Sequence, residues 1–191
     1  GREPRSIAES PDGSKILVTN ALSRNCTLLD SSSGAVLATW AAGEASLLRG
    51  VCFTPDSRYA VAAHVVSRDK QITTQINRGW IISHGFTLFN VGKDGYWTTL
   101  LLDTFSSGAA NPWGVAITPD GKRLFVSLSG IHEVAFVDLV KAIEIASATL
   151  PTERAALAED VQILDSRTVV QRFPSGGEGP RGLAFNEKWN E

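Results

Sequence analysis

One phrase recurs along the chain and limits what it can fold into. It reads "EPRSIAESPDGSKILVT" from Glu3 to Thr19, "LLRGVCFTPDSRYAVAA" from Leu47 to Ala63 and "NPWGVAITPDGKRLFVS" from Asn111 to Ser127, and it begins again as "GPRGLAFN" near the end. The shared prolines lie 44 and then 64 residues apart, at Pro11, Pro55 and Pro119. The unit is therefore about 44 residues long, with about 20 more in the second copy. Repeats of this length indicate stacked units that bury their apolar faces against one another.

Within each unit, short apolar or alternating stretches lie between turn residues, which predicts β-strands. The turn "SPDG" combines a proline that fixes φ, an aspartate that bonds the following backbone and a glycine that adopts positive φ. The expected strands are "RSIAES", "KILVTN", "CTLLD" and "AVLATW" in the first unit, and "GVAIT", "RLFVSL", "EVAFVDL" and "TVVQRF" in the third. Four antiparallel strands per repeat predict an all-β fold of β-propeller blades.

The repeat resembles the YVTN-type β-propeller repeat of bacterial and archaeal surface proteins. The resemblance rests on the pattern P-x-G-[VL]-A-x-[ST]-P-D-G-x-x-[IL]-x-V-[TS], followed by an apolar strand that ends at Asp30 or Asp138. The second copy departs from it at Leu48 (for proline) and Ser57 (for glycine). The segment from Gln71 to Val91 is similar to one in a subset of these propellers fused to c-type haem domains of the cytochrome c peroxidase kind. The resemblance implies a secreted bacterial protein, periplasmic or extracellular.

The predicted blades do not close a ring. We expect blade 1 at about 4–42, blade 2 at about 47–103, blade 3 at about 111–175 and the start of blade 4, with its first strand "RGLAF", at about 180–191. A closed propeller has about four to eight blades, and an open arc would expose apolar sheet faces to water. The remaining blades, about seven in all, are therefore expected in a longer parent chain or in a second copy associating through the open edges. The absence of methionine, even at position 1, also indicates an internal piece of a longer protein.

Two insertions interrupt the repeat. The first, 65–84, lies between the second and third strands of blade 2, on the face that also carries the connections between blades, here called the top. Loops on a rigid scaffold are frequent carriers of function. The second, 140–165, follows the third strand of blade 3 on the opposite face and predicts a short helix with Thr152 as its N-cap. That helix either packs on the rim or docks a partner.

Composition excludes several classes of function for this segment. The net charge of −2 gives no overall attraction to nucleic acid, and no apolar run approaches the roughly 20 residues of a membrane helix. The two cysteines, Cys26 and Cys52, allow at most one disulfide. There is no C-x-x-C-H motif for a c-type haem and no G-x-S-x-G elbow. We therefore expect no cofactor within this segment, with haem or metal left to the parent protein.

Arg5, Arg49, Trp113 and Arg181 occupy one position of the repeat, just before the first strand of successive blades. The first strand of a propeller blade lies nearest the axis, so these side chains are expected at the top, around the channel mouth. Converging guanidinium groups favour an anion, a carboxylate-bearing substrate or an acidic partner loop. The alternative is that each arginine braces the neighbouring blade by bonding loop carbonyls or an adjacent aspartate.

Two further sets of residues map to the top. The histidines His64, His84 and His132 are candidate metal or axial haem ligands, or else structural or solvated side chains. Arg78 and Trp80 in the first insertion offer a docking surface, because arginine and tryptophan are enriched at interface hot spots; core packing of the aromatic ring is the alternative.

Three functions remain open at this stage. The preferred one is a non-catalytic propeller segment whose top face recognises a protein domain or neighbouring subunit, beside a haem oxidoreductase module under the narrower resemblance. The second is a lactonase-like hydrolase with a metal or a histidine–carboxylate pair at the channel mouth, for which Glu133 or Asp69 would supply the acid. The third is a structural role in a cell-surface layer.

Overall fold

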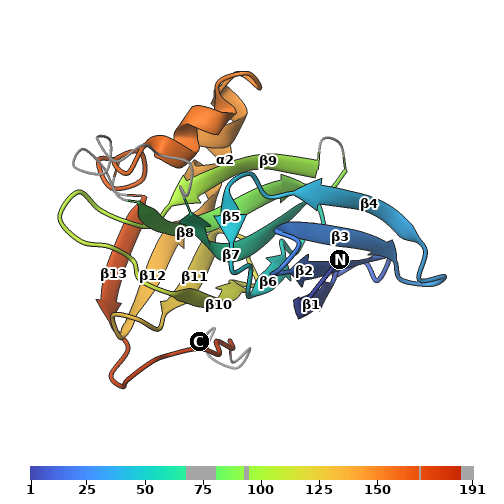
Figure 1. Ribbon diagram of the computed structural model, residues 1–191, viewed down its shortest axis with the longest axis horizontal. Coiled ribbons are helices and arrows are strands. Elements are labelled where there is room, and N and C mark those ends of the chain that lie inside the picture. The colour runs from blue at the N-terminus through green and yellow to red at the C-terminus, as the bar shows by residue number, and fades with distance from the viewer. Residues whose placement is uncertain (68–80, 93–94, 168, 186–191) are drawn as a thin grey trace.

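The computed structural model describes residues 1–67, 81–92, 95–167 and 169–185, which form three antiparallel sheets (Figure 1). Sheet 1 contains β1 (Pro4–Glu9), β2 (Lys15–Asn20), β3 (Asn25–Asp30) and β4 (Val36–Ala41). Sheet 2 contains β5 (Ala45–Ser46), β6 (Val51–Phe53), β7 (Tyr59–Ser67), β8 (Ile82–Asn90) and β9 (Gly95–Leu101). Sheet 3 contains β10 (Pro112–Ile117), β11 (Arg123–Leu128), β12 (Glu133–Asp138) and β13 (Val170–Pro174).

Strands adjacent in the sequence are adjacent in each sheet. The order is β1-β2-β3-β4 in sheet 1 and β10-β11-β12-β13 in sheet 3, while β5 and β6 both pair with β7 in sheet 2, followed by β8 and β9. The predicted all-β, antiparallel arrangement is therefore confirmed, and it is consistent with propeller blades.

The repeated turn joins the first two strands of each sheet through the same hydrogen bond. A serine or threonine hydroxyl donates to the turn aspartate, at 2.6 Å for Ser10 and Asp12, 2.5 Å for Thr54 and Asp56, and 2.5 Å for Thr118 and Asp120. The bond from Ser10 lowers the pKa of Asp12 to about 2. The residue after the aspartate has positive φ in all three copies, at Gly13, Ser57 and Gly121. Ser57 therefore adopts the turn conformation in spite of its side chain.

The three sheets pack face to face, with an apolar cluster in each interface. Alternate residues of β7 enter alternate clusters: Ala60 and Ala62 meet sheet 1, while Val61 and Ala63 meet sheet 3. Sheet 2 is thus covered on both faces, which is why β7 is buried almost throughout instead of showing an alternating pattern.

Neighbouring sheets are also linked along their first strands. The hydroxyl of Thr19 accepts from the Ser6 N–H at 3.1 Å and donates to the carbonyl of Arg49 in the next sheet at 2.9 Å. The equivalent hydroxyl in sheet 3 belongs to Ser127. It accepts from the Gly114 N–H and donates to the carbonyl of Arg181, each at 2.8 Å. A side-chain hydroxyl therefore bridges the backbones of successive repeats by hydrogen bonds.

Sheet 2 lacks this hydroxyl because Ala63 stands at the repeat position, and the first strands bond directly. The N–H of Gly50 donates to the carbonyl of Trp113 at 2.8 Å. A Cβ atom on Gly50 would lie 2.5 Å from that carbonyl oxygen, and one on Gly114 would lie 2.1 Å from the carbonyl oxygen of Arg181. Both positions require glycine because backbone of the next repeat occupies the space of a side chain.

The outer faces of sheets 1 and 3 expose apolar side chains. On sheet 1, Ile7 is 67% exposed and Val36 is 64% exposed. On sheet 3, Phe125 makes edge-to-face contacts with Phe136 and with Phe185, and Phe185 is itself 40% exposed. Such faces are typical of sheets that pack against further structure.

Three details differ from prediction or settle an open point. Residues 181–185 form no strand, because no described segment pairs with them in a ladder. Cys26 and Cys52 are free thiols, so they form no disulfide. Strands β7 and β8 extend into the predicted 65–84 insertion, whose residues 68–80 lie outside the described part of the chain.

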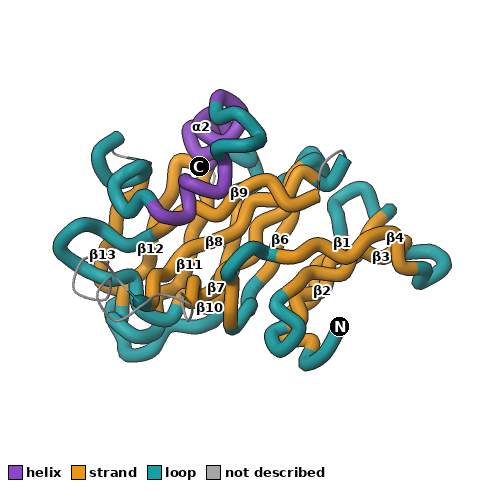
Figure 2. The backbone as a smooth tube through the Cα atoms, turned by 45° about the horizontal axis from the view of Figure 1, so that its top comes forward, coloured by secondary structure: helices purple, strands orange, loops and turns teal. Residues whose placement is uncertain are grey.

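The second insertion contains more helix than predicted, at a different place (Figure 2). The helix α2 (Leu139–Ala148) begins at Asp138, whose side chain caps it by accepting from the Lys141 N–H at 3.1 Å. Its buried residues, Leu139, Ala142, Ile145 and Ala146, form a stripe that packs on the core. The segment expected to form a short helix is the 3₁₀ helix η1 (Arg154–Glu159). Its N-cap is Glu153, not Thr152 as predicted. No helix among the described residues is long and apolar enough to cross a membrane.

The close approach of the first strands predicts a large effect of one added methyl group. Gly50→Ala and Gly114→Ala should each lower the free energy of unfolding by about 1–3 kcal/mol, because the new Cβ meets a fixed backbone carbonyl. Urea unfolding measures the effect. Gly177→Ala is the control, since nothing lies within 4 Å of a Cβ at that position. Equal stability of all three variants would contradict the contact.

Candidate functional site

Arg5, Arg49, Trp113 and Arg181 share one backbone pattern. Two positions before each of them the chain has positive φ: 55° at Glu3, 49° at Leu47, 57° at Asn111 and 56° at Gly179. The left-handed conformation costs a residue other than glycine about 1–2 kcal/mol. The rest of the fold therefore holds this turn in place, and the fourth copy adopts it although no strand follows.

A strand irregularity follows each of the first three turns. Pairing shifts register between Pro4 and Ser6 in sheet 1 and between Pro112 and Val115 in sheet 3, and in sheet 2 the first strand is broken between β5 and β6. Such bulges bend a strand and redirect a side chain. The shared repeat position therefore lies at an interruption of regular strand pairing in each of the three sheets.

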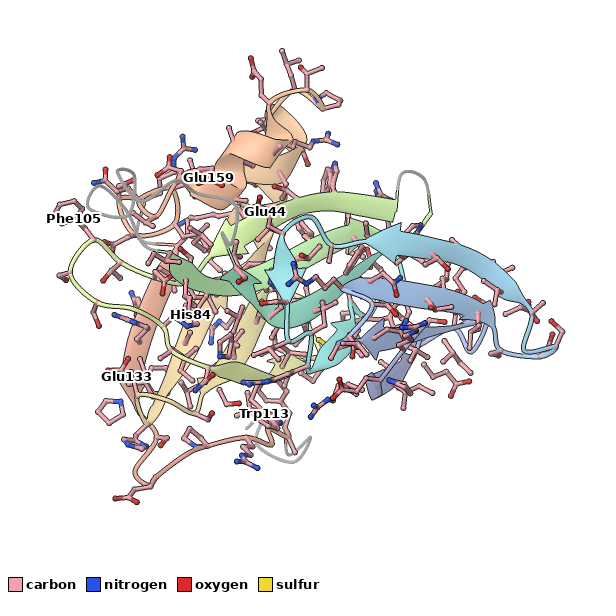
Figure 3. The ribbon with its side chains drawn as sticks, viewed as in Figure 1. Glu44, His84, Phe105, Trp113, Glu133 and Glu159 are labelled. Atoms are coloured by element: carbon pink, nitrogen blue, oxygen red, sulfur yellow. The ribbon has the colours of Figure 1, made fainter. Side chains whose placement is uncertain are left out.

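These four side chains line one open hollow of about 370 Å³, here called the arginine–tryptophan hollow. The guanidinium carbons of Arg49 and Arg181 lie 4.1 and 4.4 Å from the centre of the Trp113 ring, within cation–π range. Arg49 also donates from Nη1 to the carbonyl of Pro112 at 3.2 Å. Figure 3 labels Trp113 beside the ends of sheets 1 and 3. The structure therefore brings the four residues together, from four copies of the repeat.

Positive charge is poorly compensated in this hollow. Burial, then the nearby charges of Arg5 and Arg181, holds the pKa of Arg49 below its usual value. Arg5 pairs with Glu3, whereas neither Arg49 nor Arg181 forms an ion pair with a carboxylate among the described residues. An anion bound here would be attracted by several guanidinium groups at once.

His64 is a core residue with both ring nitrogens in use. Because a carbonyl only accepts, Nδ1–H donates to the carbonyl of Val65 at 3.1 Å, and Nε2 accepts from the hydroxyl of Thr87 at 2.8 Å. Thr87 bonds in turn to Thr99 at 2.9 Å. Burial lowers the pKa of His64 to about 4, so its imidazole is neutral at pH 7.

His84 is held by a carboxylate that the sequence did not single out. The fully buried Asp103 accepts from the backbone N–H of His84 at 2.6 Å, from its ring Nδ1 at 3.1 Å and from the N–H of Ala109 at 2.6 Å. Nδ1 of His84 therefore carries a proton, because a carboxylate oxygen accepts. The acid beside a histidine is thus Asp103; Glu133 instead lies 3.6 Å from Arg172, and Asp69 is outside the described residues.

The three histidines do not converge in this structure. Val65 pairs with His84 across β7 and β8, so His64 and His84 lie on opposite faces of sheet 2. His132 lies before β12, where its Nδ1 accepts from the Gly179 N–H at 2.9 Å. Within the described ranges no group of three or more metal-ligating side chains is found.

The loop after Asp103 presents an exposed aromatic ring that sequence reasoning also missed. Phe105 is 75% exposed at its tip (Figure 3). Arg172 holds the loop by donating to the carbonyl of Gly108 at 3.0 Å and contacting the hydroxyl of Thr104 at 3.4 Å. The polar sequence around a single phenylalanine, "DTFSSG", was the only available signal.

The predicted docking residues of the first insertion, Arg78 and Trp80, lie outside the described part of the chain. The neighbouring Trp97 packs in the core, where it stacks on Tyr59 with ring centres 5.3 Å apart.

The chain is similar to known proteins in sequence and in fold. No family model matches the sequence. Hydrazine synthase subunit beta of Kuenenia stuttgartiensis is 27% identical over 187 residues, which cover 96% of this chain and 48% of that protein. The solved structure of Kuenenia stuttgartiensis hydrazine synthase matches with a TM-score of 0.84 at 27% identity, over 94% of this chain and 51% of that one. The chain thus spans about half the length of its curated relative.

Two other solved structures are similar in fold alone. A functionally unknown protein of Desulfotomaculum acetoxidans matches with a TM-score of 0.57 and 16% identity, over 94% of this chain and 44% of that one. A putative 6-phosphogluconolactonase of Bacteroides fragilis matches with a TM-score of 0.50 and 18% identity, over 71% of this chain and 34% of that one.

The buried His64 predicts a loss of stability in acid. Its pKa is about 4 in the fold and 6.5 in the exposed reference, so the unfolded chain takes up a proton first as the pH falls between these values. The contribution of His64 is complete above about pH 6.5 and declines toward pH 4, by on the order of 3 kcal/mol. Urea unfolding at pH 7 and pH 4.5 should show a smaller pH effect in His64→Gln than in the wild type. A pH effect in His64→Gln as large as in the wild type would contradict the assignment.

Proposed function

We propose that this chain is a non-catalytic β-propeller segment that serves as an interaction scaffold for a protein domain or neighbouring subunit. The observation that carries the proposal is the likeness, over 96% of the chain, to a protein that is itself a subunit of a synthase. The TM-score of 0.84 supports the same role, because the likeness extends to the arrangement of the sheets.

The open hollow supports a recognition role at the starts of the first strands. Its residues come from four copies of the repeat and are held by backbone contacts, so the surface is formed before a partner arrives. Under the narrower resemblance, that of Gln71 to Val91, this segment lies beside a haem-bearing oxidoreductase module and holds no cofactor of its own. Under the YVTN resemblance the protein acts in the periplasm or outside the cell.

The ring of sheets continues beyond those described here, in our proposal, to a total of about seven blades. The exposed apolar faces of sheets 1 and 3 support this, since each resembles the faces that are covered between the sheets. The left-handed turn at Gly179 supports it as well, because it repeats the conformation that precedes each of the other first strands.

Native mass spectrometry of the full-length protein from its own source tests the scaffold role. We expect a hetero-complex of fixed stoichiometry that contains this chain. A protein that is recovered only as a monomer, and that hydrolyses lactones with an activity lost in His84→Ala, would overturn the proposal in favour of the hydrolase alternative.

Gly182→Ala tests whether a further blade follows. Gly182 occupies the repeat position of Gly50 and Gly114, but nothing described lies within 4 Å of a Cβ there. If a next first strand packs against it, Gly182→Ala should destabilise the full-length protein by about 1–3 kcal/mol in urea unfolding, as Gly114→Ala does. A variant as stable as the Gly177→Ala control would contradict ring continuation at this end.

A further inference from the structure

The arginine–tryptophan hollow contains more hydrogen-bond donors than the fold uses. The repeats are linked through backbone carbonyls, namely those of Arg49, Trp113 and Arg181. The links therefore involve the main chain of these residues and not their side chains. Of the Arg49 guanidinium only Nη1 has a hydrogen-bond partner among the described residues, and the Arg181 guanidinium has none. Most N–H donors of both groups are therefore available to a ligand.

The charge in the hollow selects the sign of that ligand. Burial, and after it the charges of Arg5 and Arg181, lowers the pKa of Arg49, so the three cations lie close enough to repel one another. Glu3 compensates Arg5 alone among the described residues. An anion placed between the guanidinium groups would replace this repulsion with charge-assisted hydrogen bonds, and such bonds are about twice as strong as neutral ones.

The geometry suits a carboxylate. Guanidinium groups that lie over an indole ring are restrained in orientation, and their planar forks match the two oxygens of a carboxylate. The hollow is open, and its 370 Å³ is at the small end of the range for ligand pockets, which suits one or two side chains better than a buried cofactor.

We infer that the arginine–tryptophan hollow binds the side-chain carboxylates of an acidic segment in the protein partner. This inference rests on the proposed scaffold function and names the chemistry of the partner. Arg49 and Arg181 bind the carboxylate oxygens, Trp113 restrains both guanidinium groups, and Arg5 adds positive charge at the rim.

Isothermal titration of the full-length protein at low salt tests the inference. The probes are a short blocked glutamate-rich peptide, the same peptide with glutamine at each glutamate, and inorganic phosphate. We expect the glutamate peptide to bind, the glutamine peptide not to bind, and added salt to weaken the binding. Phosphate that binds more tightly than the glutamate peptide and displaces it would overturn the inference in favour of a small-oxyanion site.

Variants locate the binding. Arg181→Gln should weaken the glutamate peptide about tenfold or more, because one charge-assisted pair is lost; it removes no side-chain hydrogen bond that the described fold uses. Arg49→Lys keeps the charge but loses the fork and should also weaken binding. Arg58→Gln is the matched control, since Arg58 is also an arginine over an aromatic ring, 5.5 Å from the centre of Tyr59, but lies in the Pro-Asp turn. Equal affinities in all three variants would place the peptide elsewhere and refute the site.

The failure of the inference differs from the failure of the scaffold role. If the native hetero-complex persists in an Arg49→Gln, Arg181→Gln double variant, the hollow is not the carboxylate site, while the scaffold proposal survives. If the double variant stays folded by circular dichroism and loses its partner, the inference is supported. If no hetero-complex forms even with wild-type protein, the scaffold proposal fails, and the inference, which depends on it, fails too.

Discussion

The structure depends on how closely neighbouring first strands approach. A backbone N–H of one sheet reaches the carbonyl of the next, directly at Gly50 and through a hydroxyl at Thr19 and Ser127. Apolar packing alone is non-directional and would let the sheets slide over one another. The hydrogen bonds fix both the distance between sheets and their offset along the strands. The glycines are a consequence of that distance, because a Cβ atom would occupy the place of the neighbouring carbonyl.

The short distance between neighbouring first strands also explains why one repeat position supplies the candidate site. The carbonyls of Arg49 and Trp113 are bonded to the preceding sheet, and the pairing of β10 with β11 shifts register around Trp113, as the pairing of β1 with β2 does around Arg5. The positive φ two residues earlier belongs to the same distortion, and it persists at Glu3, Leu47 and Asn111 although none of them is glycine. Backbone strain of this kind persists only where surrounding contacts impose it. The convergence of Arg49 and Arg181 on Trp113 thus follows from the way the sheets are joined.

Sequence reasoning succeeded where information is local or periodic. The Pro-Asp turn, the strands beside it and the convergence of Arg5, Arg49, Trp113 and Arg181 all follow from the repeat, because residues at one repeat position must occupy equivalent places. Sequence reasoning failed where the same residue at the same repeat position has two different structural roles. The aspartate that ends the third strand in the first and third units closes a turn at Asp30, by accepting from the Ser33 N–H at 2.8 Å, but caps α2 at Asp138. Only the apolar stripe that follows Asp138 distinguishes the two outcomes.

The remaining failures concern pairs that are distant in the sequence and have no repeat to relate them. His84 and Asp103 meet because the pairing of β8 with β9 brings Leu102 opposite His84, and Asp103 follows directly, beyond the end of β9. The overall composition also does not reveal how charge is distributed on the surface. A net charge of −2 excludes a general attraction for anions, yet Arg5, Arg49 and Arg181 line one hollow, where burial and then the charges of the other two arginines lower the pKa of Arg49. Net charge sums over the whole surface, whereas binding depends on the few ångströms around a ligand, so a nearly neutral protein can still hold a site of one sign.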